Sequence, residues 1–257
     1  VPLEDFPRGA RAGNLLHDIL EYADFTWRAG EGRLDSLVSK TLSRYGQDPE
    51  LWTERLSVAL EGVLDTPLGR SPGEARLCDI ARDSRISEME FILPVAHTDG
   101  ARALTPARLA AALRAHPGPG LPAGYADAVE RLRFRELQGW MRGFVDLVYC
   151  WQGRWFVVDY KSNHLGGQAA GYRGAALDAA MAHHHYVLQY HLYSVALHRA
   201  LSQRLAGYDP AQHFGGVRYL FLRGMAPDHA AGTGVFEDTP PPALLDALSR
   251  ALAGEAP

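Results

Sequence analysis

The chain has 257 residues, of which 47% are hydrophobic and 22% charged, a composition that predicts one large globular domain or one domain with a subdomain. No run approaches the roughly 18 apolar residues of a membrane span, and no signal peptide is visible at the start. Cys78 and Cys150 are too few for a disulfide framework or for an iron–sulfur cluster, so a reducing cytoplasm fits.

The formal net charge is −4. Proteins that hold nucleic acid by themselves are usually basic, so DNA must meet local basic residues here or be delivered by another protein. The phosphate-binding pattern GxxxxGK[ST] is absent, which excludes an ATP-driven motor in these residues. The opening Val1-Pro2-Leu3, without Met, is what we expect of a domain taken from a longer polypeptide.

The N-terminal part favours helices. Apolar residues recur on one face of residues 13–26, and His17 lies on the flank of that face, four residues before Glu21. An ordinary solvated histidine paired with Glu21 is one interpretation of this spacing. Asp48, followed by a proline, predicts the start of a second helix that reaches about residue 65.

The remaining segments alternate between strands and helices. Residues 88–94 read as a strand with Glu88, Glu90 and Ile92 on one side, where an ordinary solvent face is the alternative to a site. Helices are expected over residues 105–116, up to about residue 205 and over residues 244–252, and a strand over residues 217–222. In the long helix Gln189 and Tyr193 lie four apart, on one side.

The most informative segment is a predicted β-hairpin. Residues 143–150 and 155–162 are rich in Val, Phe, Tyr and Trp, and Trp151-Gln152-Gly153-Arg154 separates them. If Gln152 and Gly153 form the turn, residues that face each other have numbers that sum to 305. A four-residue loop leaves this register unchanged, whereas a local bulge would break it.

This register places two carboxylates opposite each other, because 146 and 159 sum to 305. Directly opposed Asp146 and Asp159 would have Cβ atoms roughly 5 Å apart, and Lys161 would share the face of Asp159 by strand alternation. The other face, which holds Val145, Leu147, Tyr149, Phe156, Val158 and Tyr160, should be core.

Two close carboxylates form a hard-oxygen site that suits Mg²⁺ or Mn²⁺, and an adjacent lysine can stabilise an anionic transition state or position a water molecule. That combination suits phosphodiester hydrolysis. The alternative is a surface ion pair between Asp159 and Lys161 on an edge strand, with Asp146 at a strand end.

The order of motifs along the chain resembles the PD-(D/E)XK nuclease family, and most closely the C-terminal nuclease domains of RecB-type helicase–nucleases. GFVDLV (143–148) and VVDYKSN (157–163) carry the resemblance, together with GNLLHDILE (13–21) and SEMEFILP (87–94). LQYHLY (188–193) and FGGVRYLFLRG (214–224) complete the set. DxK alone is weak, but the ordered set is specific.

The resemblance assigns roles to individual residues. It implies metal ligation by His17, Asp146, Asp159 and the main-chain carbonyl of Tyr160. Lys161 would be the catalytic lysine, acting with Asp146 and Asp159. The accessory residues would be Gln189 and Tyr193 beside the scissile strand, and Glu90 near the metal.

The resemblance further implies an α/β fold of restriction-endonuclease type, with a mixed central sheet of four or five strands flanked by helices. We expect one nuclease domain over 1–257, with a helical part to about 85, a core over about 86–225 containing a helical insertion at about 101–135, and a C-terminal tail. The implied cofactor is Mg²⁺, with Mn²⁺ or Ca²⁺ able to occupy the site.

The implied activity is hydrolysis of DNA as an exodeoxyribonuclease, in double-strand-break repair and recombination. The implied partners are single-stranded DNA or unwound duplex ends, RecC-like and RecD-like subunits, and the helicase part of the same polypeptide, with no membrane. A degenerate module that docks a partner subunit is the main alternative. A serine hydrolase is disfavoured, because the GxSxG elbow is absent.

Overall fold

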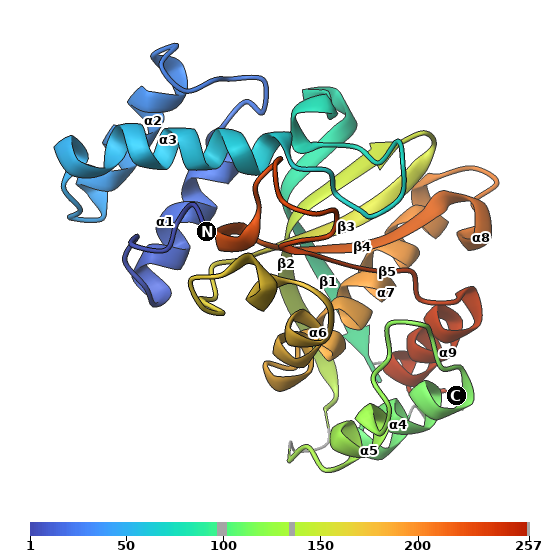
Figure 1. Ribbon diagram of the computed structural model, residues 1–257. Helices are drawn as coiled ribbons and strands as arrows, with labels where there is room; N and C mark the ends of the chain where they lie inside the picture. The colour runs from blue at the N-terminus through green and yellow to red at the C-terminus, as the bar shows by residue number, and fades with distance from the viewer. Residues whose placement is uncertain (97–101, 134–136, 256–257) are drawn as a thin grey trace.

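The computed structural model describes residues 1–96, 102–133 and 137–255, and its centre is a mixed five-stranded sheet (Figure 1). The strands lie in the order β1-β2-β3-β4-β5, with β3 and β4 parallel and the other neighbours antiparallel. Their bounds are β1 Arg85–Val95, β2 Gly139–Trp151, β3 Arg154–Lys161, β4 Phe214–Phe221 and β5 Val235–Asp238. The predicted α/β fold with a mixed sheet of four or five strands is confirmed.

Helices cover both faces of this sheet (Figure 1). One face is covered by α1 Ala10–Tyr22, α2 Arg33–Arg44 and α3 Pro49–Asp65. The other cluster contains α4 Pro106–Ala115, α5 Tyr125–Glu130, α6 Gly174–His183, α7 Tyr186–Arg204 and α9 Pro242–Ala253, while the short α8 Pro210–His213 precedes β4. No helix in these described ranges is both long and apolar enough to cross a membrane.

The sheet therefore separates two hydrophobic cores. The N-terminal core joins α1–α3 to sheet residues such as Leu147 and Val158, and the C-terminal core joins α7 and α9 to residues such as Val148 and Val157. Each core forms because the strands present apolar side chains on both faces, as the central strands of a covered sheet do.

Local sequence signals account for several element boundaries. Asp48 caps α3 as predicted, since its side chain accepts hydrogen bonds from the amides of Glu50 and Leu51. Gln152 and Gly153 both have positive φ angles, 50° and 77°, as a two-residue hairpin turn requires. The pairs Trp151–Arg154 and Leu147–Val158 both sum to 305, so the predicted register of the hairpin is confirmed.

Two expectations need correction. The helix predicted over 13–26 ends at Tyr22, because Ala23 is extended. The segment after 225 contains the helix predicted over 244–252, which is α9, but it also supplies β5, a strand that was not predicted. The predicted insertion over about 101–135 contains α4 and α5, although residues 101, 134 and 135 lie outside the described part of the chain.

Candidate active site

Asp146 of the candidate site lies on β2, just beyond the part of the strand that pairs with β3. The ladder between the strands ends at Leu147–Val158, one pair before Asp146 and Asp159. Beyond that point a side chain replaces the backbone hydrogen bonds between the strands, because Asp146 Oδ2 accepts a hydrogen bond of 2.6 Å from the amide of Tyr160. The side chain of Asp146 is thus held by the backbone of β3.

Asp159 and Lys161 form a buried ion pair on β3. Their exposed fractions are 3% and 9%, and Lys161 Nζ lies 2.5 Å from Asp159 Oδ2. The two side chains share a face, as predicted. Since β3 lies between β2 and β4, the alternative of a surface pair on an edge strand is wrong.

Lys161 is held from several sides. Its Nζ donates to Gln189 Oε1 at 3.0 Å and lies 3.9 Å from the ring centroid of Tyr186 and 5.0 Å from that of Tyr219. A carboxylate, an amide oxygen and two aromatic faces therefore stabilise the ammonium where burial alone would disfavour it.

The electrostatics of Asp159 are unfavourable to its charged form. Burial raises the pKa of this carboxyl well above its ordinary value, and the nearby Asp146 raises it further, while Lys161 and His17 oppose the shift. Asp159 Oδ2 is also buried without any donor in hydrogen-bond geometry, although Lys161 is close. A buried oxygen in this condition has capacity for a cationic ligand.

α1 carries His17 to the same place. His17 Nε2 lies 2.9 Å from the carbonyl oxygen of Tyr160, and Nδ1 lies 3.5 Å from Asp146 Oδ1. Burial lowers the pKa of His17, but the hydrogen bond and charge of Asp146, with Asp159 and the Tyr160 carbonyl, outweigh it and leave that pKa raised. The four predicted metal-binding groups thus lie together.

A close contact sets the position of α1. Gly13 packs against the end of β3, where a Cβ atom on Gly13 would meet Ser162 Oγ at 2.7 Å. The glycine at this position lets the helix backbone approach the strand end, and His17 follows one helical turn later.

α7 contributes the accessory pair. Gln189 Nε2 donates to the Tyr193 hydroxyl at 3.0 Å, and Gln189 Oε1 accepts from Lys161 and from the Tyr219 hydroxyl. Both predicted residues therefore connect to the cluster, Gln189 directly and Tyr193 through Gln189. Sequence analysis missed the contacts of Tyr186 and Tyr219 with Lys161, since their proximity depends on how α7 and β4 pack.

β1 carries two acidic residues, Glu88 and Glu90, whose surroundings differ. Glu90 is exposed and paired with Arg142 at 2.5 Å, whereas Glu88 has Asp146 and His17 among the charges that act on it. Burial, followed by Asp146, raises the pKa of Glu88. Glu88 thus interacts electrostatically with the cluster, while Glu90 pairs with Arg142, and the accessory role of Glu90 stays a prediction.

A break in strand alternation explains why Glu88 and Glu90 have different surroundings. Glu88 has a φ of 50° and forms no ladder pair with Asp146, although Ser87–Leu147 and Met89–Val145 pair on either side. Leu147 packs in the N-terminal core but Val145 in the C-terminal core, so the expectation that they share a face is wrong. The site therefore lies where β1 and β2 both depart from regular alternation, so that side chains before and after this point face opposite sides of the sheet.

Arg223 is a structural residue of the site that sequence analysis did not single out. It is fully buried and donates to the carbonyl of Ser162, next to Lys161, at 2.9 Å. It also donates to the carbonyls of Leu3, Phe6 and Pro7, which precede α1. One side chain thus ties the helix that bears His17 to the strand that bears Lys161.

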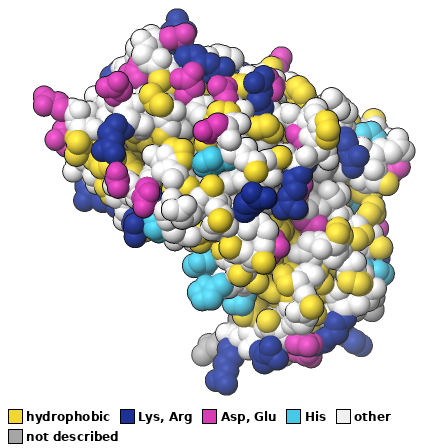
Figure 2. Space-filling model, viewed as in Figure 1, with side chains coloured by type: hydrophobic (Ala, Val, Ile, Leu, Met, Phe, Trp, Pro, Cys, Tyr) yellow, Lys and Arg dark blue, Asp and Glu magenta, His cyan; other side chains and the backbone are white. Residues whose placement is uncertain are grey.

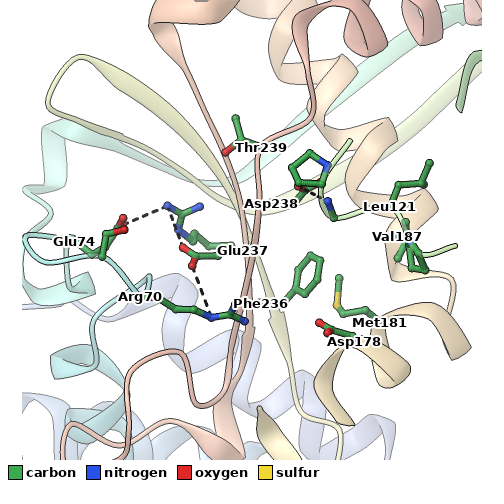
Figure 3. A pocket seen from close by; sticks show the side chains of 15 residues that line it. Arg70, Glu74, Leu121, Asp178, Met181, Val187, Phe236, Glu237, Asp238 and Thr239 are labelled. Atoms are coloured by element: carbon green, nitrogen blue, oxygen red, sulfur yellow. Dashed lines mark hydrogen bonds and ion pairs between the residues drawn. The ribbon is translucent and has the colours of Figure 1, made fainter. Parts of the chain in front are cut away.

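A separate pocket at the β5 edge does not contain the cluster. This pocket of about 760 Å³ is lined by residues including Arg70, Glu74, Arg218 and Glu237, and by none of His17, Asp146, Asp159 or Lys161 (Figure 3). Its charges pair with one another, with Arg218 3.2 Å from Glu74 and Arg70 3.8 Å from Glu237.

The molecular surface has no broad basic face in the view of Figure 2. Acidic and basic side chains are interspersed over its upper part, where Figure 1 shows α2 and α3. This mixture agrees with the net charge of −4.

Residues 3–255 match the PD-(D/E)XK nuclease superfamily. The chain belongs to this superfamily. Curated relatives of the chain are RecB subunits of the RecBCD enzyme, with which it shares 36% identity over 249 residues in Escherichia coli (strain K12) and 39% over 263 residues in Mycobacterium tuberculosis (strain CDC 1551 / Oshkosh). The matches cover 97% and 96% of this chain, and 20% and 24% of those proteins.

A third relative, RecB of Haemophilus influenzae (strain ATCC 51907 / DSM 11121 / KW20 / Rd), is 38% identical over 244 residues, or 95% of this chain and 18% of that protein. The chain spans about a fifth of the length of these relatives. The predicted superfamily, and the relationship to RecB nuclease domains, are confirmed.

Proposed function

We propose that the chain is a Mg²⁺-dependent DNA nuclease domain of exodeoxyribonuclease type, which hydrolyses phosphodiester bonds. The observation that carries this proposal is the buried Asp159–Lys161 pair beside Asp146 and His17, just beyond the last ladder pair of β2 and β3. Placing a second carboxylate, the half-buried Asp146, beside a buried ion pair is costly, and a structural ion pair alone would not require it.

The donor set supports a hard divalent cation. The cation would be held by Asp146, Asp159 and the carbonyl of Tyr160, with His17, and when bound it would neutralise phosphate charge and lower the pKa of a water molecule. Among the described residues no three His, Cys, Asp or Glu side chains converge in metal-binding geometry. His17 contacts the Tyr160 carbonyl and Lys161 contacts Asp159, so binding requires these donors to turn from one another.

The protein residues have separate tasks in this proposal. Lys161, paired with Asp159 and fixed by Gln189, orients the attacking water or stabilises the charge that develops on the phosphoryl oxygens. Gln189 and Tyr193 position the scissile strand. Water adds to phosphorus, and the bond from phosphorus to the leaving sugar oxygen breaks.

The relatives suggest the context. As part of a RecB-type subunit, the domain would receive single-stranded DNA or unwound duplex ends from the helicase part of the same polypeptide, beside RecC-like and RecD-like subunits. It would then act in double-strand-break repair and recombination. The net charge of −4 supports delivery of DNA by other parts of such an assembly, because a domain of this charge attracts DNA weakly.

The direct test is degradation of end-labelled linear single-stranded DNA in Mg²⁺ and in EDTA. The wild type should cut only with metal, and Asp159→Ala should not cut, while Asp178→Ala, which removes an exposed carboxylate elsewhere, should behave as wild type. Cutting by Asp159→Ala at the wild-type rate would contradict the assignment.

Metal binding has a readout that does not depend on activity. Mg²⁺ or Ca²⁺ at 100 times its Kd should raise the Tm of the wild type by about 5 °C, since a ligand of the folded state stabilises it. Asp159→Asn should abolish this increase. An inactive docking module would show no metal-induced shift in either protein.

A further inference from the structure

The far part of the antiparallel β1–β2 pair forms a two-stranded arm beside the site. β1 pairs with β2 from Val95–Gly139 to Arg85–Tyr149 except at Glu88 and Asp146, but β3 pairs with β2 only from Leu147 onward (Figure 1). Residues 139–145 of β2 therefore have β1 as their single ladder partner in the part of the chain that the structure describes.

One face of this arm is fixed against the protein. Phe91, Leu93, Val95 and Val145 pack in the C-terminal core, and the ring of Phe91 lies where a Cβ atom of Gly143 would be, at 2.4 Å. Alternation then turns the intervening side chains outward, to the side of the sheet on which α1 lies.

These outward side chains form an exposed row of unusual composition. The directly opposed pairs are Glu90–Phe144, Ile92–Arg142 and Pro94–Trp140. The exposed fractions are 42% for Phe144, 56% for Ile92 and 62% for Trp140. Solvated strand faces are ordinarily polar, so two aromatic rings and an isoleucine in one row indicate a binding surface.

The exposed row leads into the candidate active site. Phe144 precedes Asp146 by two residues on the same strand, a separation of about 7 Å. On β1, Glu90 likewise follows Glu88, whose charge interacts with Asp146 and His17. The row and the carboxylate of Asp146 thus lie along the same strand.

The chemistry of the row suits single-stranded nucleic acid. Aromatic side chains on β-strands stack on bases of any sequence, and a nearby arginine adds a contact for phosphate. The Arg142 guanidinium lies 5.3 Å from the ring centroid of Phe144 and pairs with Glu90, so it stands between the two aromatic residues. Stacking does not depend on counterion release, which matters for a domain of net charge −4.

We propose that Phe144, Arg142, Trp140 and Ile92 form a stacking track that holds single-stranded DNA next to the active site. The track deepens the proposed nuclease function, because it names unpaired bases as the part of the substrate that is held. Duplex DNA, whose bases are stacked internally, would not use it.

A DNA-binding measurement tests the track independently of DNA cleavage. The probe is a fluorescein-labelled 20-nucleotide oligothymidine, measured by anisotropy in EDTA so that no cleavage is needed. Phe144→Ala and Trp140→Ala should each weaken binding by about tenfold, and by a similar factor at low and high salt, because stacking is lost and not charge. Phe144→Trp should restore wild-type affinity or exceed it.

Leu51→Ala, which removes an exposed apolar side chain from α3, is the matched control and should bind as wild type. Wild-type affinity in both Phe144→Ala and Trp140→Ala, with unchanged Tm, would overturn the proposal and leave the row as a contact for another protein chain. If the nuclease proposal were wrong but the track real, the wild type would not cleave DNA, yet Phe144→Ala and Trp140→Ala would still bind the oligonucleotide more weakly.

Discussion

Glu88 and Glu90 lie on the same strand but have different surroundings. They are two apart, so alternation alone makes them equivalent, and only the left-handed backbone at Glu88 separates them. Burial and the nearby Asp146 raise the pKa of Glu88, while Glu90 forms an exposed ion pair with Arg142.

We therefore predict that Glu88→Gln lowers the DNA cleavage rate at limiting Mg²⁺ by about tenfold or more, as groups beside metal ligands do. Glu90→Gln should stay within about twofold of wild type in the same assay, because a surface ion pair contributes little. Titrating Mg²⁺ against the cleavage rate of both variants checks this. A larger loss in Glu90→Gln would return the accessory role to Glu90.

At the scale of elements, α7 serves the site and the core from different faces. Gln189 and Tyr193 face Lys161, whereas His191 is fully enclosed, with its Nδ1 2.7 Å from the carbonyl of Val187. Burial lowers the pKa of His191 to about 4 from an ordinary value of 6.5. The folded protein therefore holds this ring neutral.

The sign of the pH effect follows from this lowered pKa. Between pH 6.5 and 4 the unfolded chain binds a proton at His191 that the folded chain does not, so stability falls on acidification, by up to about 3 kcal/mol. Urea unfolding at pH 7, 5 and 4 should show a smaller loss for His191→Gln than for wild type. Equal losses would contradict the prediction, and His183→Gln, at an exposed histidine, is the control.

At the scale of the whole molecule, Arg223 joins segments that are far apart in the chain. It donates to carbonyls of residues 3, 6 and 7 and of Ser162, so the N-terminal segment, α1 and the end of β3 keep one relative position. The proposed metal-binding groups come from α1, β2 and β3, so the proposed site depends on this arrangement.

Arg223→Met should lower the free energy of unfolding by at least about 3 kcal/mol, because buried carbonyl groups lose their donor. It should also weaken Mg²⁺ binding, since His17 and Tyr160 are no longer held together. Urea unfolding and the metal-induced Tm shift measure the two effects. Arg250→Met, at an exposed arginine of α9, should change neither.

The part of the site that lies on one hairpin could be predicted from local sequence. A two-residue turn at Gln152-Gly153 and the two-residue period of strands determine the register up to Leu147–Val158, which brings Asp146 close to Asp159, and they place Lys161 on the face of Asp159. Superfamily motifs add the identities of His17, Gln189 and Tyr193, which the structure places beside that hairpin.

The sequence by itself therefore determined the fold class, the hairpin register and most of the residues that cluster. Only the tertiary structure decided that the charge of Glu88 acts on Asp146 while Glu90 pairs with Arg142, that Tyr186 and Tyr219 enclose Lys161, and that Arg223 ties α1 to β3. The physical reason is range: turn type and side-chain period are local, whereas a left-handed residue, a ring contact or a buried guanidinium depends on chain segments that meet only after folding.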